Sequence, residues 1–507
     1  NPQAEAQAAP RPGSNDPALI AAWDFSRGIG TTSFHDLGAN GNHGVLVNLP
    51  SRGCKGENWT GRHMAWPDAP EEYGAVHFHD DDLYDAGWQP TLTFQVPADL
   101  RSGVYAVRLT AMGDVFHIPV FVRPPAGKPA APLALLASTA TYLAYANRQF
   151  DMFDEFQEVK RPSMLVLNEE DVFAAENAWV GLSSYDKHAD GSGNRFSSRL
   201  RPMLHVMTAG GIWSLGADLH LIDWLEECGI AYDVVTDDDL DAEGVGAVAD
   251  YRCVMTGTHP EYCTTAMRSA LERFVEAGGR LMYMGGNGFY WRCAFHRELP
   301  GVMELRRAEN GARQWVEEPG EYHMECNGEA GGLWRNLGAP PQALVGVGMV
   351  AAGSDRSSYY RRKPGSRDAR AGFIFEGVSG EVFGAFGTVG DGAAGEELDA
   401  VDFALGTPPH AIVLASSEMH SDEYYLVPEE VPFLHPMVTG ALSGRVRADM
   451  VFFETPAGGA VFSTGSIAWA ASLAYDGYKN EVSAVTRNVV TRFLNPMPFP
   501  YPGIFDV

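Results

Sequence analysis

Between residues 133 and 286, short apolar segments alternate with longer amphipathic ones, and this alternation constrains the fold most strongly. The amphipathic segments 217–229 and 264–279 carry apolar residues at helical spacing. Strands that are apolar throughout and separated by helices are typical of a parallel sheet with both faces covered. We therefore predict an α/β domain with a mostly parallel sheet. The short apolar segments are LALLAS (133–138), SMLVLN (163–168), AYDVVT (231–236), RCVMTG (252–257) and RLMYMGG (280–286).

The α/β pattern continues toward the C-terminus. Residues 479–496 have the spacing of an amphipathic helix that ends before Pro496. Four further apolar segments precede it and are expected to be strands: 373–377, 410–416, 449–456 and 460–466.

Upstream of Pro124 the pattern changes to short strand-like segments separated by turns such as GANGNHG (38–44). Such material is typical of a β-sandwich. We divide the chain into a partial β-sandwich at 1–75, the closing strands of a sandwich at 76–124, and an α/β domain at 125–507. The expected strands before Pro124 are 21–26, 43–48, 75–79, 91–97, 103–111 and 116–124.

The start of the chain and its composition set further limits. Residues 1–16 are rich in Pro and Ala, without an initiator Met or the apolar core of a signal peptide, so we expect part of a longer polypeptide. A formal net charge of −28 argues against nucleic acid and anionic membranes as partners. No apolar run reaches the length of a membrane span. Six scattered cysteines, none at zinc-ribbon or thioredoxin spacing, indicate reduced thiols in a cytoplasmic protein.

The segment TGTHPEYC (256–263) places His259 and Glu261 between a buried strand and the helix that follows it. Ligand sites of α/β sheets gather beyond the carboxyl ends of their strands. The pair is consistent with a metal ligand beside a general base, or with a cap for the following helix. Cys263 is a weaker candidate for a nucleophile, because the glycines that flank a nucleophile elbow are missing.

Tyrosines occur near two other expected strand ends. Tyr142 and Tyr145 follow the segment 133–138, and Tyr185 lies in SSYDKH. Most tyrosines in such positions serve packing. A phenolate is also a ligand for ferric iron, although only a strongly Lewis-acidic ion deprotonates a phenol near neutral pH.

Two further clusters of titratable residues stand out. HFHDDD (77–82) places two histidines on one face of a strand before three aspartates. It suggests either a second metal site or a solvated strand end at a domain junction, and the second reading is favoured. EMHSDE (418–423) follows another expected strand and is interpreted as a site wall or interface rather than as a catalytic group.

Several strings occur together in a characteristic order. In this order they resemble the large (β) subunits of bacterial N,N-dimethylformamidases from about Asp80 to the C-terminus. Upstream, residues 23–26 and 40–61 are similar to the laminin-G-like sandwich that precedes the catalytic domain in that family. The strings are TATYLAYAN (139–147), SSYDKHADGSG (183–193), TGTHPEYCT (256–264), GGNGFYWR (285–292), GEELDAVDFALGTPPHAIVLASS (395–417) and GSIAWAASL (465–473).

The resemblance implies a glutamine-amidotransferase-like catalytic domain with one mononuclear Fe(III) per chain. At the first tyrosine position we prefer Tyr145 to Tyr142, because it lies further past the strand, beside Asn147. The implied metal ligands are Tyr145, Tyr185 and Glu261, and the implied catalytic residues are His259, Asn287 and Glu397.

The implied reaction is hydrolysis of N,N-dimethylformamide and related small N-substituted formamides to amine and formate. A ferric ion can polarise an amide carbonyl or supply hydroxide from bound water. Pro260 would hold His259 and Glu261 in fixed relation. The implied partners are a small (α) subunit and the N-terminal part of the large subunit, in an α2β2 or higher assembly. The alternatives are a hydrolase of another small amide that depends on a metal such as zinc, or a non-catalytic carbohydrate-binding or scaffold protein.

Overall fold

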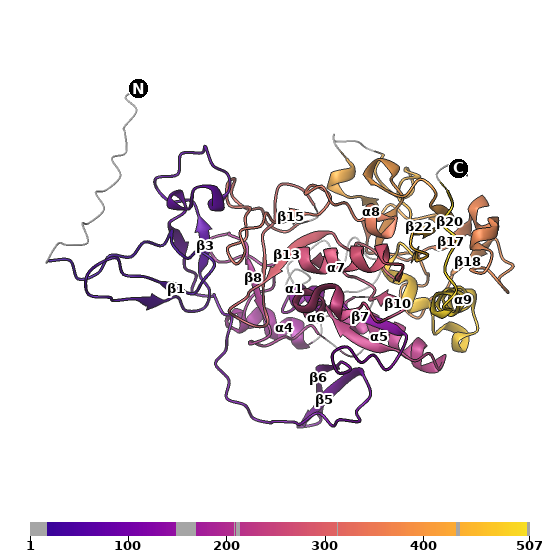
Figure 1. Cartoon of the computed structure of the whole chain (residues 1–507), viewed down its shortest axis with the longest axis horizontal. Coiled ribbons are helices and arrows are strands. Elements are labelled where there is room, and N and C mark those ends of the chain that lie inside the picture. The colour runs from indigo at the N-terminus through magenta and orange to yellow at the C-terminus, as the bar shows by residue number, and fades with distance from the viewer. Residues whose placement is uncertain are drawn as a thin grey trace.

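The computed structural model describes residues 18–148, 169–206, 208, 213–311, 313–431 and 437–503. Its centre is a nine-stranded mixed sheet in the order β18-β17-β20-β22-β23-β12-β10-β7-β9 (Figure 1). Neighbouring strands from β9 to β23 run parallel, and those from β23 to β18 run antiparallel. The parallel part contains β7 (Leu133–Ala137), β9 (Asp233–Thr236), β10 (Cys253–Thr256), β12 (Arg280–Tyr283) and β23 (Ala460–Ser463). The antiparallel part contains β17 (Tyr359–Arg362), β18 (Val382–Phe383), β20 (Ile412–Glu418) and β22 (Asp449–Glu454).

The parallel part of the sheet is buried on both faces, which explains why its strands are largely apolar. In β7, Leu133 and Leu135 join one hydrophobic core, whereas Ala134 and Leu136 join another on the opposite face. Successive side chains of a strand point to opposite faces, so each face needs its own cover.

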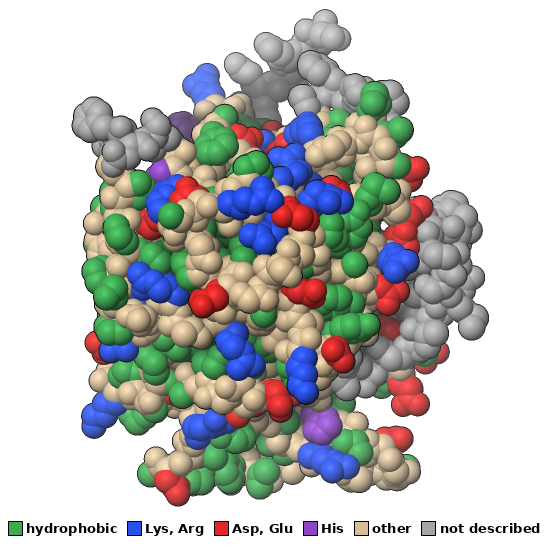
Figure 2. All heavy atoms as spheres, turned by 90° about the vertical axis from the view of Figure 1, so that its right-hand side faces the viewer, with side chains coloured by type: hydrophobic (Ala, Val, Ile, Leu, Met, Phe, Trp, Pro, Cys, Tyr) green, Lys and Arg blue, Asp and Glu red, His purple; other side chains and the backbone are tan. Residues whose placement is uncertain are grey.

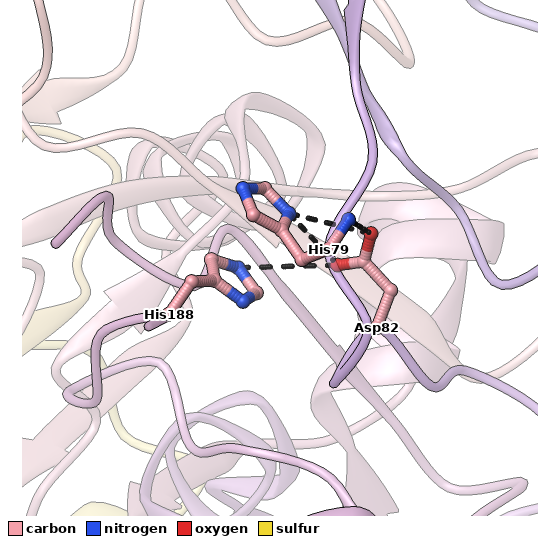
Figure 3. Close-up of side chains that lie close together, drawn as sticks. All are labelled: His79, Asp82 and His188. Atoms are coloured by element: carbon pink, nitrogen blue, oxygen red, sulfur yellow. Dashed lines mark hydrogen bonds and ion pairs between the residues drawn. The ribbon is translucent and has the colours of Figure 1, made fainter. Parts of the chain in front are cut away.

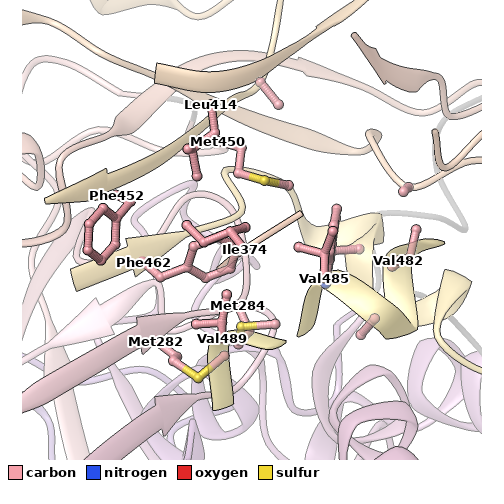
Figure 4. Packing of buried hydrophobic residues seen from close by; sticks show 14 of the residues in the cluster. Met282, Met284, Ile374, Leu414, Met450, Phe452, Phe462, Val482, Val485 and Val489 are labelled. Carbon is pink, nitrogen blue, oxygen red and sulfur yellow. The ribbon is translucent and has the colours of Figure 1, made fainter. Parts of the chain in front are cut away.

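Helices supply this cover. The first core contains residues of α5 (Ser214–Glu227) and α9 (Glu481–Leu494), and the second contains residues of α6 (Asp237–Glu243) and α7 (Thr265–Glu276). In Figure 4, Val489 of α9 lies beside Met282 of β12, and Val482 and Val485 belong to the same core. The start of α7 is fixed by Thr264, whose hydroxyl oxygen accepts a hydrogen bond from the Met267 N–H at 3.1 Å.

Two smaller sheets lie beside the central one. The first has the order β11-β13-β14-β8, with β15 paired to β13, and the second has the order β19-β16-β21. Short helices complete the fold: α1 (Thr139–Tyr145), α4 (Glu169–Glu176) and α8 (Gln342–Val345). The strands are β8 (Phe196–Ser198), β11 (Tyr262–Cys263), β13 (Trp291–Phe295), β14 (Val302–Leu305), β15 (Gly332–Leu333), β16 (Gly348–Gly353), β19 (Glu397–Ala400) and β21 (Tyr424–Leu426).

Residues 18–124 form three separate two-stranded sheets: β1 (Ser33–Phe34) with β2 (Gly44–Val45), β3 (Ser51–Cys54) with β4 (Ala75–His77), and the hairpin of β5 (Gly103–Ala111) and β6 (Asp114–Val122). In Figure 1 this hairpin lies at the edge of the molecule.

Three segments that we expected to be strands are not strands. Residues 21–26 and 91–97 form none, and residues 373–377 form mainly turns. Apolar alternation yields a strand only where a neighbour supplies hydrogen bonds. In 91–97 Leu92, Phe94 and Val96 are instead exposed. The expected strand at 163–168 lies outside the described residues, and the laminin-G-like and glutamine-amidotransferase-like descriptions stay predictions.

The charges on the surface and the lengths of the helices are relevant to the kinds of partner the protein can have. On the face drawn in Figure 2, Lys and Arg side chains lie among acidic and apolar ones. Within the described residues, none of the helices combines the length and the apolar character needed to cross a membrane. All six cysteines are free thiols.

Candidate active site

A cavity of about 650 Å³ brings together five of the six residues expected in the site. Five different segments of the chain supply them. Tyr145 ends α1 directly after β7, Glu261 follows β10, Asn287 follows β12 and Glu397 begins β19, while Tyr185 lies in a loop before β8. Residues 309, 311 and 313–316, together with 425 and 428, complete the lining.

Two phenol groups meet at the carboxylate of Glu261. The Tyr145 hydroxyl donates a hydrogen bond to Oε2 of Glu261 at 2.8 Å, and the Tyr185 hydroxyl lies 3.3 Å from the same oxygen. The Glu261 N–H donates to Oγ1 of Thr141 at 3.1 Å, which fixes the backbone at this point. Glu261 is only 2% exposed, so three oxygen donors converge in a largely dry place.

Burial changes the protonation of these groups. It raises the pKa of Glu261 to about 7, against the opposing effect of His259. Burial, reinforced by the Glu261 carboxylate, raises the pKa of both Tyr145 and Tyr185 well above that of a free phenol. Without a cation the phenols therefore keep their protons. Two phenol oxygens and a carboxylate form a hard, potentially trianionic donor set, which fits a trivalent cation such as Fe(III).

His259 lies between two carboxylates. Its Nε2 atom is 2.8 Å from Oε2 of Glu397 and 3.4 Å from Oε2 of Glu261. Burial acts to lower the pKa of His259, but the carboxylates of Glu397 and Glu261 outweigh this effect and raise it. The ring packs edge-on against Trp213, with 5.2 Å between ring centroids. Its Nδ1 atom has no hydrogen-bond partner among the described residues.

Asn287 has a strained backbone and an unsatisfied side chain. Its φ of 49° lies in the left-handed region, which asparagine tolerates better than most residues. The Asn287 N–H donates to Oδ1 of Asp399 at 2.8 Å, and Tyr283 donates to the other oxygen at 2.7 Å. Oδ1 of Asn287 is buried and has no hydrogen-bond partner within the described part of the chain. It is therefore available to a molecule in the cavity.

The two glycines before Asn287 allow the loops to approach closely. A Cβ at Gly285 would lie 1.8 Å from the carbonyl oxygen of Thr258, and one at Gly286 would lie 2.4 Å from that of Glu397. Any larger residue would push these loops apart. The glycines therefore set the distance between the loops that carry His259, Asn287 and Glu397.

The sequence analysis missed two residues that contact Tyr185. The Tyr262 hydroxyl donates to the Tyr185 oxygen at 2.7 Å, and Arg307 donates to the Tyr262 oxygen at 3.1 Å. The fully buried guanidinium of Arg307 lies over the Tyr185 ring, 4.6 Å from its centroid. Tyr262 could have been found, since it follows Glu261 directly. Arg307 lies in a polar stretch without regular periodicity, so no pattern pointed to it.

The weaker candidates lie elsewhere. The Tyr142 hydroxyl donates to Asp218 rather than to Glu261. Cys263 is fully buried, and burial raises the pKa of its thiol far above the usual value, which argues against a nucleophile.

The cluster at 418–423 also lies apart from the cavity. Glu418 forms an ion pair with Arg361 at 2.7 Å, and His420 lies 2.7 Å from the Ser417 hydroxyl. Neither Glu418 nor His420 lines the cavity.

Comparisons with known proteins place this chain in a family. The sequence profile described as "N,N-dimethylformamidase beta subunit-like, C-terminal" matches residues 51–481. The N,N-dimethylformamidase beta subunits of Paracoccus aminophilus and of an Alcaligenes species are each 43% identical to this chain over 493 residues. The alignments cover 95% of this chain and 65% of each relative, so the chain spans just under two thirds of their length.

A solved structure gives less information. A ThuA-like protein from Bacteroides uniformis aligns with 73% of this chain and 94% of its own, at 12% identity and a TM-score of 0.29, which is too low to carry an argument. The family profile, in contrast, covers most of the sequence and agrees with the resemblance seen in the ordered strings. The chain therefore belongs to the family of N,N-dimethylformamidase beta subunit-like proteins.

Proposed function

We propose that the protein hydrolyses the amide bond of N,N-dimethylformamide and related small N-substituted formamides, giving an amine and formate. The observation that carries this proposal is the convergence of Tyr145 and Tyr185 on Glu261, with His259 beside them, at the wall of a cavity. Membership of the family supports the reaction class. The cavity, at about 650 Å³, has ample room for a small amide.

Tyr145, Tyr185 and Glu261 would hold one Fe(III) per chain. Three oxygen donors in a buried place match a hard cation, and their combined negative charge would offset its triple positive charge. When bound, this ion supplies the Lewis acidity that an amide, a poor electrophile, needs. Tyr262 and Arg307 would fix the orientation of the Tyr185 ring and oxygen.

His259 would move the proton of the reaction. Hydrolysis adds a water oxygen to the formyl carbon and breaks the C–N bond, and one proton passes from water to the departing nitrogen. His259 can accept and return that proton, while Glu397, 2.8 Å from Nε2, keeps the ring in place. The amide side chain of Asn287 would orient the substrate through the unsatisfied Oδ1 or through its NH2 group.

The names of the relatives also suggest an assembly. Both are named beta subunits, so we propose that this chain works with a small (α) subunit in an α2β2 or higher assembly. We also propose the cytoplasm as its compartment, which the six free thiols suit. The N-terminal part of such a beta subunit would be a further partner.

The test is an assay of the purified protein, together with any subunit that co-purifies, for release of dimethylamine and formate from N,N-dimethylformamide. Iron content is measured on the same sample. Glu261→Gln should abolish activity and remove most of the iron, because it deletes an anionic ligand. Glu276→Gln, on the exposed side of α7, is the matched control and should change neither. Full iron occupancy in Glu261→Gln would refute the ligand assignment, and an iron-loaded protein without amide hydrolysis would refute the reaction.

A further inference from the structure

A second group of potential metal ligands lies outside the cavity. His79, Asp82 and His188 have ligand atoms that all lie within 4.8 Å of one another. The Nδ1 atom of His79 is 3.3 Å from Oδ1 of Asp82, and Nε2 of His188 is 3.9 Å from the same oxygen. Figure 3 shows both rings with a nitrogen directed toward the Asp82 carboxylate. The histidines come from segments more than a hundred positions apart in the sequence.

The second nitrogen of each histidine ring already has a polar side chain beside it. Nδ1 of His188 lies 2.6 Å from Oδ1 of Asp81. Nε2 of His79 lies 3.1 Å from the Ser192 hydroxyl and 3.6 Å from Oδ2 of Asp190. Metal-binding histidines almost always donate their second N–H to a carboxylate or a similar acceptor, which fixes the tautomer and exposes the lone pair of the ligating nitrogen.

With the rings in these tautomers, acceptor atoms face one another. Nδ1 of His79 and Nε2 of His188 would both present lone pairs to the Asp82 carboxylate, an arrangement that a positive charge between them, from a proton or a metal ion, would stabilise. The side chains of His79, His188 and Asp82 are 6%, 2% and 11% exposed, so bulk water cannot screen the repulsion. Burial raises the pKa of Asp82, which means that its charge is costly there without compensation.

The excess of carboxylates around the two histidines also favours a bound cation. The carboxylates of Asp81, Asp82 and Asp190 surround two imidazoles. Within the described residues, none of these three carboxylates forms an ion pair with a Lys or Arg. A divalent cation would balance this excess of negative charge.

We propose that His79, Asp82 and His188 form a binding site for a divalent transition-metal ion, best matched by zinc. Two imidazoles and one carboxylate are a common zinc ligand set and leave a fourth position for water. The rings are now stacked, with centroids 3.7 Å apart and planes at 4°. Parallel rings direct their lone pairs side by side, so binding requires the rings to tilt toward a common point.

Such an ion would join two parts of the chain. His79 and Asp82 follow β4, whereas His188 lies three positions after Tyr185 in the loop that forms one wall of the cavity. The ion would therefore act as a structural clamp that fixes the Tyr185 loop to the N-terminal segment, separate from the Tyr145–Tyr185–Glu261 site.

The test measures zinc binding directly. The full chain is treated with a chelator, dialysed against micromolar Zn²⁺ alone, and its zinc content and melting temperature are measured. His79→Gln and Asp82→Asn should each lose about one zinc per chain and the zinc-dependent rise in melting temperature. The matched controls are His77→Gln and Asp80→Asn, exposed neighbours outside the cluster, which should behave like the wild-type protein.

Glu261→Gln separates this site from the proposed iron site. It should lose iron yet keep the zinc and its effect on the melting temperature. The proposal is overturned if the wild-type protein takes up no zinc, or if His79→Gln and Asp82→Asn, folded by circular dichroism, take up as much as the wild type. Two independent variants guard against the case in which one of them fails to fold.

Discussion

The hydroxyl of Tyr145 donates a 2.8 Å hydrogen bond to the buried carboxylate of Glu261. The two residues come from different βα connections, after β7 and after β10, which are adjacent parallel strands. Tyr142 lies on the same helix but donates to Asp218, which also accepts a hydrogen bond from the Thr258 N–H at 2.6 Å. Two tyrosines in one short helix thus belong to different hydrogen-bond networks.

Tyr145→Phe and Tyr142→Phe should therefore behave differently. If Tyr145 binds Fe(III) as a phenolate, its loss should remove or weaken the visible phenolate-to-iron charge-transfer band and lower iron content. Tyr142→Phe should keep both and cost about 1–3 kcal/mol of unfolding free energy, because buried Asp218 loses one of its donors. Visible spectra, iron analysis and urea unfolding distinguish the two. A band that survives in Tyr145→Phe but disappears in Tyr142→Phe would reverse the assignment.

His259→Ala should retain iron and lose turnover by about two to four orders of magnitude, the usual contribution of a positioned acid–base group. The reason is that Tyr145, Tyr185 and Glu261 already supply three oxygen donors, so His259, which faces Glu397 and Glu261, is not needed as a ligand. Steady-state hydrolysis of N,N-dimethylformamide and iron content should be measured on one preparation. Loss of iron together with activity would make His259 a ligand instead.

Tyr262→Phe removes the hydrogen bond that the Tyr185 oxygen receives. This hydrogen bond would stabilise the filled orbitals of a Tyr185 phenolate, so its loss should move the charge-transfer band to longer wavelength at unchanged iron content. Tyr251→Phe is the matched control, since its hydroxyl donates to Asp233 at 3.2 Å, away from the cavity. An unshifted band in Tyr262→Phe would show that Tyr185 is not a ligand.

His420 should make stability depend on pH. Burial lowers the pKa of His420 from 6.5 to about 4. Between these values the unfolded chain binds a proton that the folded chain does not, so stability falls as the pH is lowered. From pH 7 to pH 5 this loss is about 2 kcal/mol.

Replacing the buried imidazole tests the assignment to His420. In His420→Gln the pH-dependent loss should be smaller by the contribution of this one group, as measured by urea unfolding at both pH values. His63→Gln, on the surface, should keep the full wild-type loss. An identical pH dependence in His420→Gln and the wild type would contradict the assignment.

The sequence predicted the central elements well, because burial on both faces leaves a clear apolar signal. The segments 133–138, 231–236, 252–257 and 280–286 correspond to β7, β9, β10 and β12, and 479–496 contains α9. Apolar alternation in 91–97 failed as a predictor, since no described strand pairs with it. Nor could the sequence predict that β22 would run antiparallel to β23, because direction depends on the path of the connections.

Site residues that are close in sequence could be predicted together, whereas contacts between residues far apart in sequence could not. The spacing of His259 and Glu261 placed both at a strand end, and the structure brings them together with Glu397. The burial of Arg307 against Tyr185 depends on a fold in which distant segments meet, and residue types alone do not encode such a meeting.

The close approach at Gly285 and Gly286 has a consequence for how relatives could diverge. Because a single added methyl group at either position would collide with a neighbouring backbone, the junction of loops next to Asn287 is closed to change. Glu309, Gln314 and Val316, which line the cavity with exposed side chains, are not held in this way. We therefore expect new substrate preferences in the family to arise by exchange of these exposed side chains around a junction that is inherited intact.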